Sequence, residues 1–164
     1  MTISTGLIFV LAGAALSAAL PGFGSAKATG MVGEAAAGVI TEDPSKFGKV
    51  LIMQVLPGTQ GLYGFLTAIL LLSYSGVLGG GFSENPVSIE KGLAFFCACL
   101  PIIIVGPLSA IAQAKAAVGG VGIVAKNPDQ SGKGIIFAAM VETYAVLALL
   151  VSLLAIIQIN GIAL

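Results

Sequence analysis

Four long apolar stretches dominate this sequence and limit what it can fold into. They run roughly over residues 3–40, 47–78, 88–125 and 132–160. Each exceeds the ~20 residues that a helix needs to cross a hydrocarbon core ~30 Å thick. Backbone polar groups in lipid must be satisfied inside a helix or a closed barrel. The stretches lack the alternation of polar and apolar residues that marks barrel strands. They therefore predict an all-α membrane protein with four transmembrane helices.

The composition supports the bilayer as the solvent of this chain. Hydrophobic residues make up 57% of it and charged residues only 9%, with a mean hydropathy of +1.08. Soluble domains average about 25% charged residues. A net charge of zero and the absence of Arg argue against nucleic acid as a partner. Cys97 and Cys99 have too few neighbouring ligands for a metal site, so we interpret them as small buried residues.

The chain contains an internal repeat. The segment DPSKFGKVLI at 43–52 resembles NPDQSGKGII at 127–136, an offset of 84 residues. Upstream, SAKATG at 25–30 resembles QAKAAV at 113–118, an offset of 88 residues. The repeat predicts a duplicated two-helix hairpin. Because the repeat includes the first apolar stretch, which lacks the positive n-region of a signal peptide, we expect that stretch to be retained as a helix.

The duplication suggests a simple organisation and topology. We expect a single membrane domain over residues 1–164, with hairpin 1 at 1–80 and hairpin 2 at 81–164. The positive-inside rule places the loops at 41–47 and 126–133 in the cytoplasm and both termini on the opposite side. Six of the seven lysines lie in or beside these two loops: Lys27, Lys46, Lys49, Lys115, Lys126 and Lys133.

Lys27 and Lys115 lie deeper along their helices than the other four lysines near these loops. Glu34 follows Lys27 by seven residues and is a candidate partner on the same helix face. The roles of these three residues stay open.

The first and third apolar stretches are rich in Gly and Ala, whereas the second and fourth are richer in Leu, Ile, Phe and Tyr. Small residues let helices approach closely in membranes. The inner circumference of a ring is short and requires thin helices there. We therefore interpret the chain as one protomer of a ring, with the first and third helices inside; the alternative is ordinary tight packing.

A lone carboxylate, Glu142, lies within the apolar run IIFAAMVETYAVLALLVSLLAII. An ionised side chain in the membrane costs about 2.5–3.5 kcal/mol on insertion scales, so it needs partners or a task. At ~1.5 Å per residue from the loops, Thr59, Gln60 and Gln113 reach nearly the depth of Glu142. Polar residues of three helices are therefore expected to meet.

The residue types at this depth favour a hard cation. Pro57 interrupts backbone hydrogen bonding, which makes the Leu56 carbonyl a further candidate ligand. Carboxylate, hydroxyl, amide and carbonyl oxygens suit hard cations, and one negative charge suits Na⁺, with Li⁺ or H⁺ as competitors. Tyr63, one turn after Thr59, either bonds Glu142 or lines the outer face. The alternative is a purely structural hydrogen-bond cluster with Glu142 protonated.

The repeat indicates one charged site for every four helices. The offset of 84 residues places Gly58 opposite Glu142, and the offset of 88 places Ser25 opposite Gln113. The first hairpin therefore has no carboxylate at the corresponding position, and Ser25 is a candidate for a shortened counterpart of Gln113.

Together, GFGSAKATGMVGEAAAG, LPGTQGLYGF, SAIAQAKAAVGG and GIIFAAMVETYAVLALL resemble the K-subunit proteolipid of V-type ATPases, above all the sodium-translocating bacterial type. The resemblance covers essentially the whole chain. It implies a non-catalytic rotor subunit in a ring of identical copies, each with one ion-carrying glutamate, here Glu142. It also implies a Na⁺ ligand set and a glutamate-locking hydrogen bond from Tyr63; the ligands besides Glu142 are Thr59, Gln60, Gln113 and the backbone carbonyl of Leu56.

The resemblance further implies the partners of the ring. These are a stator membrane subunit that supplies an Arg, central-stalk subunits and the lipid of the cell membrane, with no cofactor beyond the transported Na⁺. The alternatives are the same rotor role with H⁺ as the coupling ion, or a structural or pore-forming ring. A monomeric secondary transporter is the weakest, because the two hairpins repeat in parallel and are not inverted.

Overall fold

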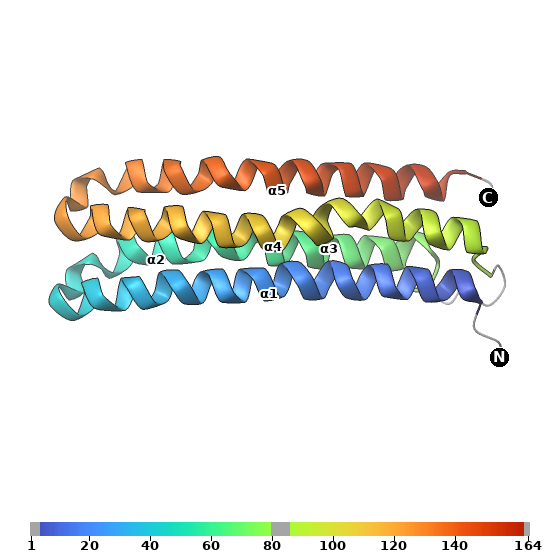
Figure 1. Ribbon diagram of the computed structural model, residues 1–164, viewed down its shortest axis with the longest axis horizontal. Helices are drawn as coiled ribbons and strands as arrows, with labels where there is room; N and C mark the ends of the chain where they lie inside the picture. The colour runs from blue at the N-terminus through green and yellow to red at the C-terminus, as the bar shows by residue number, and fades with distance from the viewer. Residues whose placement is uncertain (1–3, 80–85, 163–164) are drawn as a thin grey trace.

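The protein is a bundle of four long helical legs that lie side by side (Figure 1). The computed structural model describes residues 4–79 and 86–162. The first, third and fourth legs are the helices α1 (Thr5–Glu42), α4 (Ile89–Lys126) and α5 (Ser131–Asn160). The described residues contain no strand, and all four legs are long and apolar enough to cross a membrane. The predicted all-α fold is therefore confirmed.

The second leg differs from the single helix that the sequence predicts. It consists of α2 (Phe47–Val55), a 3₁₀ turn η2 (Leu56–Gly58) and α3 (Thr59–Tyr74). The turn forms at Pro57, which is buried and cannot donate a backbone hydrogen bond. As a result α3 begins inside the leg, and its first turn carries two of the residues that the sequence places at the depth of Glu142, Thr59 and Gln60.

Short connections join the legs within each half of the chain. The 3₁₀ turns η1 (Pro44–Lys46) and η4 (Pro128–Gln130) lie at one end of the bundle, while α1 begins and α5 ends at the other (Figure 1). Both halves therefore run in the same sense, as a parallel duplication requires. The predicted boundary between the hairpins, at residues 80 and 81, lies outside the described residues.

Contacts between the two halves fix both ends of the bundle. At one end the Ser4 hydroxyl, which caps α1, donates to the Val87 carbonyl at 3.2 Å. At the other end the Lys46 ammonium donates to the Ala125 carbonyl at 2.9 Å, near the C-terminus of α4. A cation there is favourably placed toward the helix dipole. The hairpins are thus held in register at both ends.

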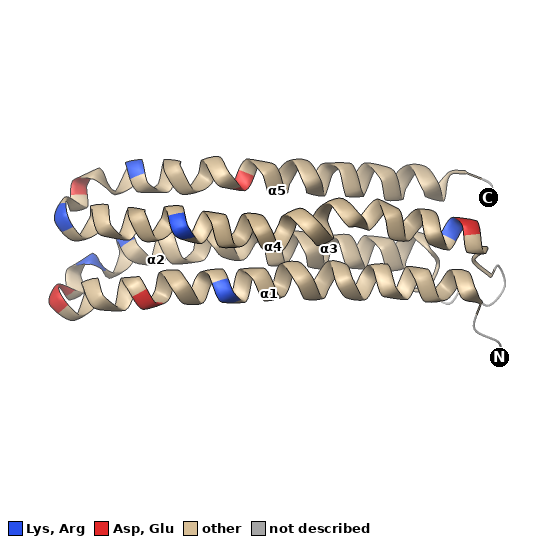
Figure 2. Cartoon of the chain, viewed as in Figure 1, with Lys and Arg blue, Asp and Glu red and all other residues tan. Residues whose placement is uncertain are grey.

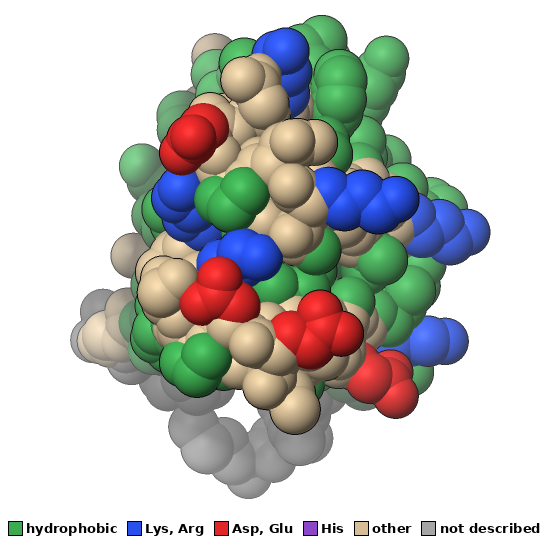
Figure 3. Space-filling model, turned by 90° about the vertical axis from the view of Figure 1, so that its left-hand side faces the viewer, with side chains coloured by type: hydrophobic (Ala, Val, Ile, Leu, Met, Phe, Trp, Pro, Cys, Tyr) green, Lys and Arg blue, Asp and Glu red, His purple; other side chains and the backbone are tan. Residues whose placement is uncertain are grey.

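Charged side chains gather at the end that carries η1 and η4, and few occur along the middle of the legs (Figure 2). An end-on view shows lysines and acidic residues of both connections sharing this face (Figure 3). Lys49, in the first turn of α2, approaches Asp129 of η4 at 3.6 Å. This charge distribution suits a membrane–water boundary.

The helices pack through small residues. α1 and α4 lie against each other along their length, with α3 on α1 and α5 on α4. A Cβ on Gly24 would overlap the Pro107 backbone of α4, and a Cβ on Gly64 would overlap the Ser17 carbonyl of α1. Glycine at these two positions therefore lets α1 approach both neighbours. The buried core on the side of the connections is built mainly from Ala and Val.

We predict that Gly24→Ala lowers the thermal stability of the detergent-solubilised protein, because the added methyl group has no space against Pro107. Overpacking of this kind typically costs about 1–3 kcal/mol. The control is Gly30→Ala on the same helix, where a Cβ meets nothing within 4 Å. Circular dichroism during heating measures both variants. Equal melting temperatures for the two would contradict the contact.

Candidate ion-binding site

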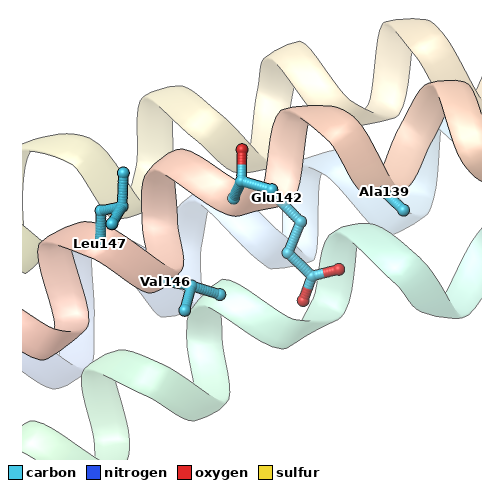
Figure 4. Close-up of a pocket in the computed structure, with 5 residues that line it drawn as sticks. Ala139, Glu142, Val146 and Leu147 are labelled. Atoms are coloured by element: carbon cyan, nitrogen blue, oxygen red, sulfur yellow. The ribbon is translucent and has the colours of Figure 1, made fainter.

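Glu142 lies in the middle of α5 and is half-buried, with its carboxylate directed toward α3 (Figure 4). The Tyr63 hydroxyl donates a hydrogen bond to Glu142 Oε1 at 2.5 Å. The amide nitrogen of Gln113 donates to Glu142 Oε2 at 3.4 Å. Both carboxylate oxygens therefore have donors, one from α3 and one from α4. Donors from two other helices fix the position of the carboxylate within the bundle.

Gln60 and Gln113 continue this polar chain into the core. Both side chains are fully buried, and the amide nitrogen of Gln60 donates to the amide oxygen of Gln113 at 2.6 Å. The remaining oxygen of Gln60, Oε1, has no hydrogen-bond partner among the described residues. An unsatisfied buried polar atom costs about 1–3 kcal/mol. An amide oxygen readily coordinates a cation. The oxygen atoms of this site therefore fit a hard monovalent ion.

Leu56 and Thr59 lie beside this chain, at the break in the second leg. The Leu56 carbonyl accepts the backbone N–H of Thr59, and it also accepts the Thr59 hydroxyl at 3.0 Å. Neither residue is hydrogen-bonded to Glu142. The four side chains Tyr63, Gln60, Gln113 and Glu142 thus form one connected chain, and the oxygens of Leu56 and Thr59 bond each other next to it.

The outer side of Glu142 is apolar. A surface pocket beside the carboxylate is lined by Ala139, Thr143, Val146 and Leu147 (Figure 4). Thr143 directs its hydroxyl back to the Met140 carbonyl of its own helix at 2.8 Å. The carboxylate therefore lies at a boundary, with the polar chain on its inner side and an apolar surface outside.

One serine of α1 and one serine of α4 contact the backbone beside the chain. Ser25 on α1 accepts the backbone N–H of Gly61 at 2.8 Å, and Ser109 on α4 donates to the Val141 carbonyl at 3.3 Å. The predicted correspondence of Ser25 with Gln113 is wrong, because the bounds of α1 and α4 differ by 84 residues at both ends and therefore pair Ser25 with Ser109. The 84-residue offset of the loops could have identified Ser109 from the sequence, because it places this serine opposite Ser25.

The three unassigned charged residues are exposed and do not contribute to the site. Lys27, Glu34 and Lys115 form no ion pair within the described parts of the chain, so the considered pairing of Lys27 with Glu34 is not present.

Comparisons with known proteins agree with the duplication. The family model for the C subunit of ATP synthase matches the chain twice, at residues 12–71 and 96–155. The matches are related by the same 84-residue offset as the loops, which confirms the internal repeat.

Two characterised relatives match nearly the whole chain. A V-type sodium ATPase subunit K of Enterococcus hirae is 46% identical and aligns over 96% of this chain and 96% of its own length. An A-type ATP synthase subunit K of Methanocaldococcus jannaschii is 40% identical over 93% of this chain, which spans 64% of that protein. These matches and the four apolar legs together indicate a multi-pass membrane protein.

Proposed function

The chain belongs to the family of the ATP synthase C subunit, and we propose that it is the ion-carrying rotor subunit of a V-type ATPase, with Na⁺ bound at Glu142. The observation that carries the proposal is a chain of hydrogen bonds: the Glu142 carboxylate accepts the buried amide of Gln113 on α4, which in turn accepts the buried amide of Gln60 on α3. The relative from Enterococcus hirae, a sodium ATPase subunit, supports Na⁺ as the ion. The protein itself performs no covalent chemistry.

The proposed ligands are oxygen atoms that surround the Glu142 carboxylate. Gln60 supplies its unpartnered Oε1. Gln113 directs its nitrogen toward Glu142, so its amide must turn about the last side-chain bond to present oxygen to Na⁺. The Thr59 hydroxyl and the Leu56 carbonyl complete the ligand set when the hydrogen bond between them breaks and both oxygens coordinate the ion. Tyr63 keeps its hydrogen bond to Glu142 and holds the carboxylate in place.

Charge neutralisation explains how this site works in a rotor. Na⁺ on Glu142 cancels the single negative charge, so the loaded site can face lipid at its apolar outer side without the cost of an exposed carboxylate. We propose that identical copies form a ring with α1 and α4 inside, which fits the small residues at their contacts. A stator membrane subunit with an Arg then releases the ion, and central-stalk subunits couple the ring to ATP hydrolysis.

The topology of the proposed rotor protein follows from its lysines. The connections at 41–47 and 126–133 face the cytoplasm, and both termini face the opposite side, in accordance with the positive-inside rule. Hairpin 1 at 1–80 and hairpin 2 at 81–164 then form one membrane domain of the ring.

We predict that Na⁺ protects Glu142 of the wild-type ring from modification by a hydrophobic carbodiimide, because that reagent needs the protonated acid and Na⁺ replaces the proton. The labelling rate at neutral pH should fall with rising Na⁺ and stay constant in equal concentrations of a large organic cation. Glu142→Gln serves as the site control and should not be labelled at this position. If millimolar Na⁺ leaves the labelling rate unchanged, Na⁺ is excluded as the coupling ion and H⁺ remains.

We further predict that Gln113→Ala raises the Na⁺ concentration needed for half-protection by about tenfold, as expected for loss of one ligand to a charged group. The matched control is Gln54→Ala on α2, an amide on the same leg as Gln60 but outside the polar chain. Labelling by the carbodiimide over a Na⁺ series measures both variants, with ring assembly checked by size-exclusion chromatography. Equal Na⁺ dependence in Gln113→Ala and the wild type would remove Gln113 from the ligand set.

A further inference from the structure

The start of α3 has no capping side chain from its own segment. The first backbone N–H groups of a helix lack partners within that helix. Thr59, the first residue of α3, donates its N–H to the Leu56 carbonyl through the 3₁₀ turn. The preceding residue, Gly58, has no side chain that can cap the helix. The N–H of Gly61, also in the first turn of α3, donates to a side chain of another helix.

Ser25 of α1 acts as a capping residue for α3. Its hydroxyl oxygen accepts the N–H of Gly61, the third residue of α3, at 2.8 Å, and its side chain is buried. The third helical position is one of those that a capping side chain normally serves. Here the cap comes from a different helix, across the contact between α1 and α3.

Glycine at position 61 makes this contact possible. A Cβ there would come to 3.2 Å from Ser25 Cβ and 3.3 Å from Ser25 Oγ, closer than side chains usually pack. Gly61 directly follows Gln60, whose unpartnered amide oxygen is a proposed Na⁺ ligand. Ser25 therefore holds in place the first turn of α3, the backbone that carries the Gln60 side chain.

We propose that Ser25 is a positioning residue of the ion site, which caps α3 from α1 and thereby sets the place of the Gln60 and Leu56 oxygens. The inference rests on the proposed function, Na⁺ binding at Glu142. It assigns different tasks to the two halves of the repeat. Gln113 of the second half contacts the carboxylate directly, and Ser25 of the first half orders the backbone that presents other ligands.

The test is Ser25→Ala in the assembled ring, measured as the Na⁺ concentration that halves carbodiimide labelling of Glu142. We expect an increase of about fivefold, the scale of one hydrogen bond lost in the ordering of the site. The labelling rate without Na⁺ should stay unchanged across pH, because the contacts of Glu142 with Tyr63 and Gln113 remain. A general loosening of the bundle would change that pH profile as well.

Ser17→Ala is the matched control on the same helix. Ser17 is also fully buried, and its hydroxyl has no hydrogen-bond partner among the described residues, so its removal should leave the Na⁺ dependence unchanged. Gly61→Ala should reproduce the effect of Ser25→Ala by pushing the hydroxyl away, and it decides the question if the Ser25 variant fails to assemble.

Three results would overturn the inference while wild-type protection by Na⁺ is intact. These are unchanged Na⁺ dependence in Ser25→Ala or in Gly61→Ala, an equal loss in Ser17→Ala, or a parallel shift of the Na⁺-free pH profile. If Na⁺ gives no protection even in the wild type, the proposed function fails and the positioning role fails with it.

Discussion

The Glu142 carboxylate in the middle of a membrane-spanning helix is the constraint on which the rest of this structure depends. An ionised group at that depth is costly, and hydrogen-bond donors or a cation must compensate for the lost water. The protein supplies the donors from two other helices, through Tyr63 on α3 and Gln113 on α4. Three of the four legs must therefore keep their register to within a fraction of a helical turn.

The packing of the bundle provides that register. Small residues bring α1 against α3 and α4 so closely that side chains as short as serine reach the neighbouring backbone. The break at Pro57 then starts a new helix inside the second leg, with its first turn at the depth of the carboxylate. At the break the Leu56 carbonyl accepts both the N–H of Thr59, in the 3₁₀ turn, and the Thr59 hydroxyl. The break thus places the oxygens of Leu56 and Thr59 beside each other at this depth.

Much of this arrangement is predictable from sequence, because membrane spans, internal repeats and residue depth each follow from counting along the chain. Length and hydropathy predict the four legs, and depth along the helices predicts that Gln60, Gln113 and Glu142 meet. Counting does not give the rotation of a helix or the direction of an amide. The Leu56–Thr59 bond, the nitrogen that Gln113 presents to Glu142 and the contact of Ser109 with Val141 all depend on those angles. The 3₁₀ turn also escapes prediction, since a proline signals an interruption without specifying its geometry.

The most direct measurement of the central claim is an experimental structure of the purified ring, determined once in Na⁺ and once in a sodium-free buffer of the same pH. If Glu142 carries Na⁺, the sodium structure will contain density for an ion between the Glu142 carboxylate and the amide oxygens of Gln60 and Gln113. The Gln113 amide will be turned relative to the sodium-free structure, and each copy in the ring will hold one ion. Identical side-chain positions in both structures, with no ion density beside Glu142 in saturating Na⁺, would contradict the account.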